Sequence, residues 1–246
     1  MLLNQKTLLV TGAGRGIGLE IARCALREGA NVIAHTGRGE FDSPLLHEEN
    51  VLTLAADLTK PIDIERLWTD AVAWKGRVDV LVNNAGVYAP SPLQTKSAWD
   101  DGWDKNLSIN LKAPAALCRS AIGHFQQGKE GIIINIASRS SHRGDDENHL
   151  AYGAAKGGLL ALTKGIARSY SSCNAVAYAV APAWVRTSMA EAHIKLHGEH
   201  ALTAELPMRE ITPPTDVAET VIFLASGRAR HANGCTIDIT GADYVR

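Results

Sequence analysis

The chain has 246 residues, of which 46% are hydrophobic, and its formal net charge at pH 7 is −1. A chain of this length forms one large domain or two small ones, with a core that needs no disulfides. The nearly neutral charge gives no indication of binding to nucleic acid or to an anionic membrane. No apolar run reaches the ~18 residues that a membrane-spanning helix needs. The first residues lead directly into a strand-like run, without a secretory signal.

The cysteines form neither a Cys-x-x-Cys pair nor a mixed Cys/His ligand pattern. We therefore interpret them as free thiols in a reducing, cytoplasmic compartment. His193 and His197 have the i, i+4 spacing that can share a metal ion. No third ligand is evident, so we predict no metal site. The four cysteines are Cys24, Cys118, Cys173 and Cys235.

The chain begins with a strand, a glycine-rich turn, a helix and a second strand. Residues 7–10 form a short apolar run, which favours a buried strand. Residues 11–18 read Thr-Gly-Ala-Gly-Arg-Gly-Ile-Gly, helical periodicity follows over 19–28, and a strand is expected at 31–34. Glycines in such a turn let backbone N–H groups approach a pyrophosphate at the helix N-terminus. This unit therefore predicts a dinucleotide site.

The same alternation continues along the chain. Strands that alternate with helices indicate a parallel sheet covered on both faces. Because no linker or repeat interrupts the pattern, we predict one domain over 1–246, a Rossmann-type doubly wound α/β fold. Further strands are expected at 51–55, 78–82, 131–137, 175–181 and 235–239, and further helices at 62–74, 99–124, 150–170 and 215–225.

Several polar or glycine-containing motifs fall at the carboxyl ends of the expected strands. Ligands of open parallel sheets bind beyond these ends, so the motifs are predicted to converge on one crevice. The residues concerned are Gly12, Asp57, Asn84, Ser138 and Pro182.

Tyr152 and Lys156 stand four residues apart in the helix expected at 150–170. Residues at this spacing project from one face of a helix. A neighbouring cation favours the phenolate, so we expect Lys156 to lower the pKa of Tyr152 from about 10 toward the range of a proton donor. Small residues surround the pair, which leaves room for a cofactor ring or a partner helix.

With Ser138 and Asn110, this pair completes an Asn, Ser, Tyr, Lys set, and the chain resembles the short-chain dehydrogenase/reductase family. The resemblance covers nearly the whole chain and several motifs in order. It implies that Tyr152 is the general acid in reduction and the base in oxidation, and that Lys156 also holds the nicotinamide ribose. Ser138 would hydrogen-bond the substrate carbonyl. The motifs are the glycine turn at 11–18, Asp57, Asn83-Asn84-Ala85-Gly86, Asn110, Ser138, Tyr152-x-x-x-Lys156, and Pro182 followed by Thr187.

The resemblance implies that Asn110 places a water molecule in a proton relay. Pro114 follows four residues later and has no N–H, so the Asn110 carbonyl loses its helical partner. Such a carbonyl needs another donor, and a water linked to Lys156 would serve. The alternative is that Pro114 only kinks the helix.

The resemblance also implies a set of cofactor contacts. Asp57 would bond the adenine amino group, although it could instead cap the next helix. Asn84 and Gly86 would line the adenosine ribose, and Thr187 would meet the nicotinamide carboxamide. The full expected set is Gly12, Arg15, Gly16, Ile17, Gly18, Thr36, Arg38, Asp57, Leu58, Asn84, Ala85, Gly86, Tyr152, Lys156, Pro182, Val185 and Thr187.

The residues after the second strand favour NADP(H). An NAD site usually has an acidic residue ~20 positions past the glycines, but Thr36 holds that place. Arg15 and Arg38 could bind a 2′-phosphate, and Thr36 does not repel it. NAD(H) remains possible, because Glu40 could reach back to the ribose.

Three features depart from the family pattern without touching the tetrad. Ala183 follows Pro182 where glycine is usual, and Tyr178 stands where asparagine is usual. The segment between Ser138 and Tyr152 is about one residue longer than the family pattern leads us to expect.

The segment 139–150 bears on the substrate, because in the family it borders the pocket. Eleven of its twelve residues are polar, charged or glycine. Buried charges facing an apolar ligand would be costly, so we favour a small polar carbonyl compound, with Arg139 and His142 as candidate contacts. The alternative is that this loop faces water. A substrate lid is expected at 188–212.

Two other functions remain open: a 3-oxoacyl-thioester reductase of fatty-acid synthesis, and a dinucleotide-binding regulator without turnover. The intact tetrad argues against the regulator, because sensing needs no proton donor. The resemblance further implies a homodimer or homotetramer with a small-molecule substrate, and no nucleic-acid or membrane partner.

Overall fold

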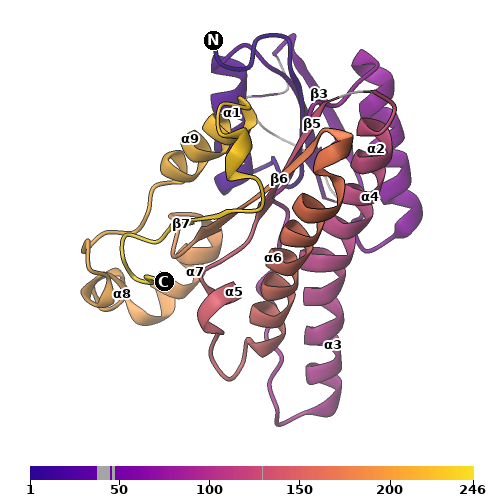
Figure 1. Cartoon of the computed structure of the whole chain (residues 1–246). Helices are drawn as coiled ribbons and strands as arrows, with labels where there is room; N and C mark the ends of the chain where they lie inside the picture. The colour runs from indigo at the N-terminus through magenta and orange to yellow at the C-terminus, as the bar shows by residue number, and fades with distance from the viewer. Residues whose placement is uncertain (38–44, 46–47, 129) are drawn as a thin grey trace.

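The computed structural model describes residues 1–37, 45, 48–128 and 130–246. Seven strands form one parallel sheet in the order β3-β2-β1-β4-β5-β6-β7 (Figure 1). The strand order reverses beside β1, where ligands of such sheets bind. The strands are β1 (Thr7–Val10), β2 (Asn31–Thr36), β3 (Val51–Ala55), β4 (Val80–Asn83), β5 (Gly131–Ile136), β6 (Ala175–Pro182) and β7 (Thr236–Ile239).

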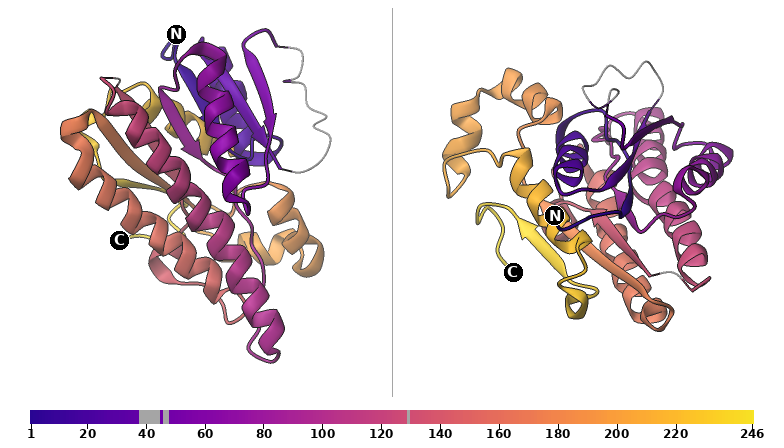
Figure 2. Two further views of the ribbon diagram at one scale, coloured as in Figure 1. Left: turned by 90° about the vertical axis from the view of Figure 1, so that its right-hand side faces the viewer. Right: turned by 90° about the horizontal axis from the view of Figure 1, so that it is seen from above.

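Helices cover both faces of the sheet, as Figures 1 and 2 show. The α-helices are α1 (Gly16–Arg27), α2 (Pro61–Lys75), α3 (Lys96–Leu107), α4 (Ala113–Phe125), α5 (Ser140–Arg143), α6 (Leu150–Tyr170), α7 (Ser188–His197), α8 (Glu199–Glu205) and α9 (Pro214–Ala225). A π-helix, η2 (Ser108–Lys112), joins α3 to α4, and η3 (Ser171–Cys173) and η4 (Arg230–Ala232) are short 3₁₀ turns.

The hydrophobic core lies on both sides of the sheet, because alternate side chains of a strand point to opposite faces. On β1, Leu8 packs in the cluster beneath α1 and α9, whereas Leu9 packs in the cluster beneath α2, α4 and α6. Every residue of β1, β4, β5 and β6 is buried, as expected for strands that are covered twice. The predicted doubly wound fold is confirmed.

The expected elements are found with small shifts at their ends, and α6 begins and ends where the sequence predicts. The main difference is the helix expected at 99–124, which the structure divides into α3, η2 and α4. In η2 the N–H of Ala113 donates to the carbonyl of Ser108, five residues back. A π-helix marks a local irregularity that is frequent at functional sites.

The segment expected to be a lid contains α7 and α8. Leu202, Leu206 and Ile211 form a small apolar cluster there, against which Trp184 and Ile194 pack. The role of 188–212 as a lid stays a prediction. Within the described residues, no helix combines the length and apolar character that crossing a membrane requires.

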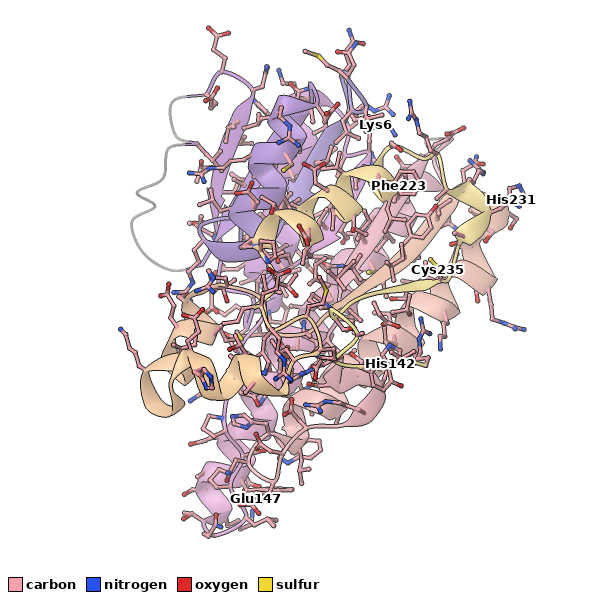
Figure 3. All side chains as sticks on the ribbon, turned by 90° about the vertical axis from the view of Figure 1, so that its left-hand side faces the viewer. Lys6, His142, Glu147, Phe223, His231 and Cys235 are labelled. Atoms are coloured by element: carbon pink, nitrogen blue, oxygen red, sulfur yellow. The ribbon has the colours of Figure 1, made fainter. Side chains whose placement is uncertain are left out.

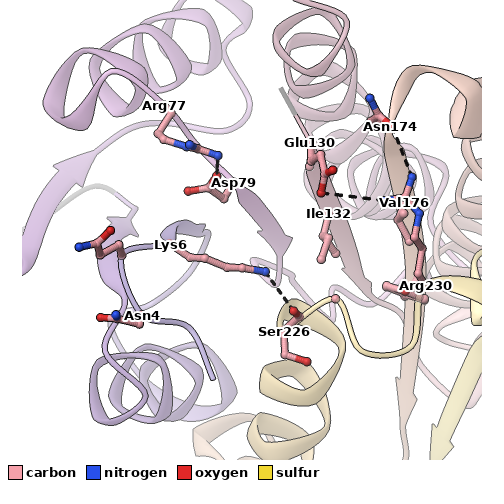
Figure 4. Close-up of a pocket in the computed structure, with 14 residues that line it drawn as sticks. Asn4, Lys6, Arg77, Asp79, Glu130, Ile132, Asn174, Val176, Ser226 and Arg230 are labelled. Atoms are coloured by element: carbon pink, nitrogen blue, oxygen red, sulfur yellow. Dashed lines mark hydrogen bonds and ion pairs between the residues drawn. The ribbon is translucent and has the colours of Figure 1, made fainter. Parts of the chain in front are cut away.

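A cavity of about 460 Å³ opens at the amino ends of the strands, opposite the glycine turn (Figure 4). Its charged side chains already have partners within the protein. Lys6 Nζ donates to the carbonyl oxygens of Ala225 and Ser226, at 2.9 and 3.1 Å. Arg77 pairs with Asp79. The Lys6 contacts join the N-terminal segment to the end of α9, so we assign the cavity a structural role.

Candidate active site

The glycine turn between β1 and α1 packs too closely for side chains. Gly12 and Gly16 have φ values of +67° and +55°, which L-residues with side chains rarely adopt. A Cβ on Gly12 would lie 2.9 Å from Ala85 Cα, and one on Gly18 would lie 2.2 Å from the Gly12 carbonyl oxygen. The turn therefore brings bare backbone to the N-terminus of α1, where an anion is favoured.

His35, which the sequence analysis missed, supports this turn from β2. Its Nδ1 accepts a hydrogen bond from the Gly12 N–H at 3.1 Å, and its Nε2 lies 3.2 Å from the Ala56 carbonyl oxygen. These partners require the neutral ring with its proton on Nε2. Burial lowers the pKa of His35, which favours that form. A histidine directly after the apolar run 32–34 was the available signal.

Asn84 supports the same turn from the end of β4. Its side-chain amide donates to the carbonyl oxygens of Thr11, at 2.8 Å, and Gly12, at 3.2 Å. The Thr11 hydroxyl accepts from the backbone N–H groups of Asn84 and Ala85. Asn84 thus fixes the turn by its side chain, and its predicted contact with ribose stays a prediction.

The adenine end of the expected cofactor site contains Thr36 and Asp57. The Thr36 hydroxyl is buried at the end of β2 and has no hydrogen-bond partner among the described residues, so it can bond a ligand there. Asp57 accepts from the N–H and the hydroxyl of Thr59. Its alternative role as a helix cap is wrong, because Lys60 is the N-cap residue of α2 and no side chain caps it. Arg38 and Glu40 lie outside the described residues.

The structure brings together the other expected cofactor residues at the carboxyl ends of β1, β4 and β6. Arg15 is exposed at the N-cap of α1, and Ile17 lies in its first turn. Thr187 is the N-cap residue of α7, and its Cγ2 would lie 3.0 Å from a Cβ on Gly16. Ala85, Pro182 and Val185 are buried or partly buried in these end segments, and Leu58 is buried after β3.

Two departures from the family pattern are accommodated. Tyr178 is fully buried in β6, and its hydroxyl donates to the Ala229 carbonyl oxygen at 2.8 Å. The N–H of Ala183 donates to Ile239 in β7. Neither contact displaces the catalytic candidates.

Ser138, Tyr152 and Lys156 meet beside the end of β5. Ser138 is buried, and its hydroxyl beside the Tyr152 phenol lowers the pKa of that group. Lys156 is only 4% exposed. Its Nζ donates to the Ile136 carbonyl oxygen at 2.7 Å and lies 5.9 Å from the centre of the Tyr152 ring. The predicted face of α6 is therefore formed.

The expected direction of the Tyr152 pKa is wrong. Burial raises this pKa to about 12, the charge of Asp145 also raises it, and the Ser138 hydrogen bond and Arg139 lower it. Burial also disfavours the charged form of Lys156, which lowers the pKa of this group to about 8. The ammonium group is bound to the Ile136 carbonyl, and desolvation outweighs its attraction for a phenolate.

Asn110 is fully buried in the π-helix η2. Its Oδ1 accepts from the Val87 N–H at 3.0 Å, and its Nδ2 donates to the Val87 carbonyl at 2.9 Å and to Asn106 Oδ1 at 3.1 Å. A Cβ on Gly86 would lie 3.0 Å from Asn110 Oδ1 and 3.5 Å from Lys156 Nζ. Gly86 therefore allows these two side chains to approach. The relay role of Asn110 stays a prediction.

Pro114 lies in the first turn of α4, directly after η2. The proline and the π-helix therefore occur together, rather than the proline alone kinking one continuous helix. The wider spacing of the π-helix changes the backbone pairing around Asn110.

The two candidate substrate contacts in 139–150 are bound to the C-terminal segment instead. Arg139 forms an ion pair with Asp243 and lies 5.7 Å from the centre of the Trp184 ring. His142 Nε2 lies 3.3 Å from Asp238 Oδ1, and its ring stacks on Tyr244. Figure 3 shows His142 beside this segment. The sequence reasoning missed these partners because they follow about 100 residues later.

Another part of the same segment borders Tyr152. Tyr88 packs edge-on against the Tyr152 ring, with centres 4.8 Å apart, and stacks on His149 at 3.7 Å. The Tyr88 hydroxyl donates to Asp145 at 3.1 Å and lies 3.4 Å from Asp146. We call Tyr88, Asp145, Asp146 and His149 the polar wall. Its position supports the expectation that 139–150 reaches the pocket.

Metal binding lacks a described ligand set. No group of three or more His, Cys, Asp or Glu side chains is placed to hold a metal ion within the part of the chain that the structure describes. His193 and His197 lie in α7, but their side chains are outside that part.

Comparison with known proteins shows the family of the chain. The family model described as Enoyl-(Acyl carrier protein) reductase matches residues 12–241. A 3-oxoacyl-(acyl-carrier-protein) reductase of Staphylococcus aureus strain Mu50 is 31% identical over 246 residues, which cover 98% of each chain. Those of Vibrio cholerae and Vibrio harveyi are each 32% identical over 100% of both chains. The chain belongs to the short-chain dehydrogenase/reductase family and is an NAD(P)-dependent oxidoreductase that acts on C=O and CH–OH groups.

Proposed function

We propose that the protein is an NADP(H)-dependent reductase that converts a ketone to a secondary alcohol. The observation that carries this proposal is the placement of Ser138 and Tyr152 side by side next to buried Lys156. With a pKa near 12, the Tyr152 phenol holds its proton at neutral pH and can give it to a carbonyl oxygen. Ser138 orients that oxygen and donates a hydrogen bond to it.

Lys156 completes the acid–base group. Below about pH 8 it is charged, and a charge beside Tyr152 stabilises the phenolate that forms when the proton leaves. When bound, the nicotinamide cofactor supplies the hydride. Restoring the proton to Tyr152 through a water near Asn110 remains part of the proposal.

The chain's own residues fit an NADP(H) cofactor. The buried hydroxyl of Thr36, which has no partner among the described residues, and the exposed Arg15 side chain would meet the 2′-phosphate. Gly12, Gly16 and Gly18 keep side chains out of the turn at the N-terminus of α1, where the pyrophosphate would bind. A comparison of kcat/KM for NADPH and NADH tests the preference, and a clear preference for NADH contradicts it.

The first substrate class that we propose is a 3-oxoacyl thioester. Relatives with this activity in their names match over 98–100% of the chain. A small polar carbonyl compound is the second candidate. The polar wall supports this second candidate. Its phenol, imidazole and carboxylate groups beside Tyr152 can form hydrogen bonds with a hydroxylated substrate, whereas contact with an alkyl chain would leave them unpaired.

One assay separates these candidates. The rate of NADPH oxidation is measured with acetoacetyl-pantetheine, with longer 3-oxoacyl thioesters and with small hydroxylated ketones such as dihydroxyacetone. Higher kcat/KM for the thioesters supports the first class, and the reverse supports the second. Tyr152→Phe is the control: its rate should fall at least ~100-fold, as for a lost general acid, while NADPH binding persists. Normal turnover in this variant refutes the acid–base assignment.

If NADPH binds but none of these substrate classes reacts, the result supports a dinucleotide-binding regulator without turnover. The proposal also includes a cytoplasmic location and assembly into a homodimer or homotetramer. Light scattering of the purified protein tests the assembly. The partly exposed edge strand β7 is compatible with such an assembly.

A further inference from the structure

Asp145 connects two sides of the candidate active site. Its Oδ2 accepts a hydrogen bond from the Ser140 hydroxyl at 2.6 Å. Its Oδ1 accepts from the Tyr88 hydroxyl at 3.1 Å and from the Asp146 N–H at 3.0 Å. Ser140 belongs to the segment after β5, whereas Tyr88 follows β4, so one carboxylate joins two separate loops.

Both loops lead directly to the catalytic candidates. The Ser140 N–H donates to the Ser138 hydroxyl oxygen at 3.1 Å. On the other side, the Tyr88 ring meets the Tyr152 ring edge-on, with an interplanar angle of 87°. A continuous chain of contacts thus runs from Ser138 through Ser140, Asp145 and Tyr88 to Tyr152.

The packing of α6 also holds Asp145 in place. A Cβ on Gly153 would lie 3.4 Å from the backbone nitrogen of Asp145 and 3.5 Å from the Ser140 carbonyl oxygen. Gly153 follows Tyr152 directly in the chain. The segment around Asp145 therefore rests on the first turn of the helix that carries Tyr152.

We propose that Asp145 is a positioning residue for the Ser138 and Tyr152 pair, and that its negative charge adds to the burial of the Tyr152 phenol in keeping it in the proton-donating form that reduction needs. The proposal rests on the proposed roles of Ser138 and Tyr152. It adds a residue that touches neither carbonyl nor cofactor and acts through Ser140 and Tyr88.

The electrostatic part follows from the groups that face Tyr152. Burial and the charge of Asp145 raise the pKa of the phenol, and Ser138 and Arg139 lower it. The other charged or titratable side chains around Tyr152 are Lys156 on the same helix, Tyr88 against the ring, and His149 and Asp146 behind Tyr88.

Asp145→Asn separates charge from shape. The amide oxygen can still accept a hydrogen bond from Ser140 or Tyr88, so the loop should stay in place while the charge is lost. We expect the apparent pKa that limits alcohol oxidation to move to lower pH, with unchanged affinity for NADP⁺. Asp145→Ala also removes the connection between the loops, and kcat should fall by at least ~10-fold, since a misplacement of ~1 Å can cost ~100-fold.

Glu147→Gln is the matched control. Glu147 is exposed in the same segment, at the narrow end of the molecule in Figure 3, and its loss of charge should leave the pH profile unchanged. Tyr88→Phe retains the ring but loses the hydroxyl, so it should lower kcat without the pH shift of Asp145→Asn.

Titration of the phenol gives a readout that does not depend on turnover. Ultraviolet difference spectra of the wild type and of Tyr152→Phe isolate the Tyr152 signal, and the same pair in the Asp145→Asn background should ionise at lower pH. Unmoved titration and unmoved pH profiles in Asp145→Asn overturn the electrostatic role. A wild-type kcat in Asp145→Ala overturns the positioning role. If Asp145→Ala does not fold, a wild-type kcat in Tyr88→Phe overturns the positioning role instead. Turnover in Tyr152→Phe would instead refute the proposed function.

Discussion

Lys156→Met should change how the stability of the protein depends on pH. The side chain is buried, and its pKa falls from 10.5 to about 8. At ~1.4 kcal/mol per pKa unit, this difference corresponds to a destabilisation of about 3 kcal/mol when the group is charged. The penalty is fully present below pH 8, because there the folded protein holds the charge in its interior.

The sign of the effect follows from proton binding. Between pH 8 and 10.5 the unfolded chain binds more protons at this lysine than the folded protein does, so wild-type stability gains from this group as pH rises. Lys156→Met removes the gain. At pH 7 it also leaves the Ile136 carbonyl without its donor, which costs about 1–3 kcal/mol. The pH dependence is therefore a cleaner measure than the difference at one pH.

Urea unfolding at pH 7, 8, 9 and 10 provides the assay. The free energy of unfolding of the wild type, minus that of Lys156→Met, should increase by about 2–3 kcal/mol across this range. Lys164→Met is the control, because Lys164 lies on the exposed side of the same helix; its difference from the wild type should stay constant. A constant difference for Lys156→Met as well would show that Lys156 is not buried as a cation and would refute the reasoning.

The remaining predictions concern the cofactor end of the site. Gly18→Ala places a Cβ 2.2 Å from a backbone oxygen, so the affinity for NADPH in a fluorescence titration should fall at least ~10-fold; Gly123→Ala, which meets nothing within 4 Å, should bind normally. Because the pKa of His35 is lowered, its contribution to stability is present above pH ~6.5 and is lost as pH falls through its lower folded value. We therefore expect the wild type to bind NADPH more weakly at acid pH, because protonation of His35 disturbs the glycine turn. His35→Gln should lack this pH dependence, and an unchanged acid dependence in the variant would count against this role. Thr36→Asp should shift the ratio of kcat/KM toward NADH by at least ~10-fold, because a carboxylate binds ribose hydroxyls and repels a 2′-phosphate; an unaltered ratio would exclude Thr36 from cofactor choice.

Local patterns in the sequence were sufficient for the fold and for the principal motifs. Apolar runs bounded by turns predicted the strands, because buried parallel strands are apolar on both faces. The spacing of Tyr152 and Lys156 placed both on one face of α6, since a helix repeats every 3.6 residues. The glycine turn was identifiable because only glycine fits its backbone and its close approach to Asn84 and Ala85.

Interactions between distant segments decided the rest. The sequence places a cation one turn from Tyr152, but only the folded chain determines that burial dominates and that Lys156 donates to Ile136. Desolvation depends on every neighbouring group, so spacing along one helix cannot give its size or its sign. In the same way, only the tertiary structure directs Arg139 to Asp243 and joins Asp145 to Tyr88, 57 residues away. A polar loop has no periodicity that reveals its partners, because the contacts that orient its side chains come from the elements packed around it.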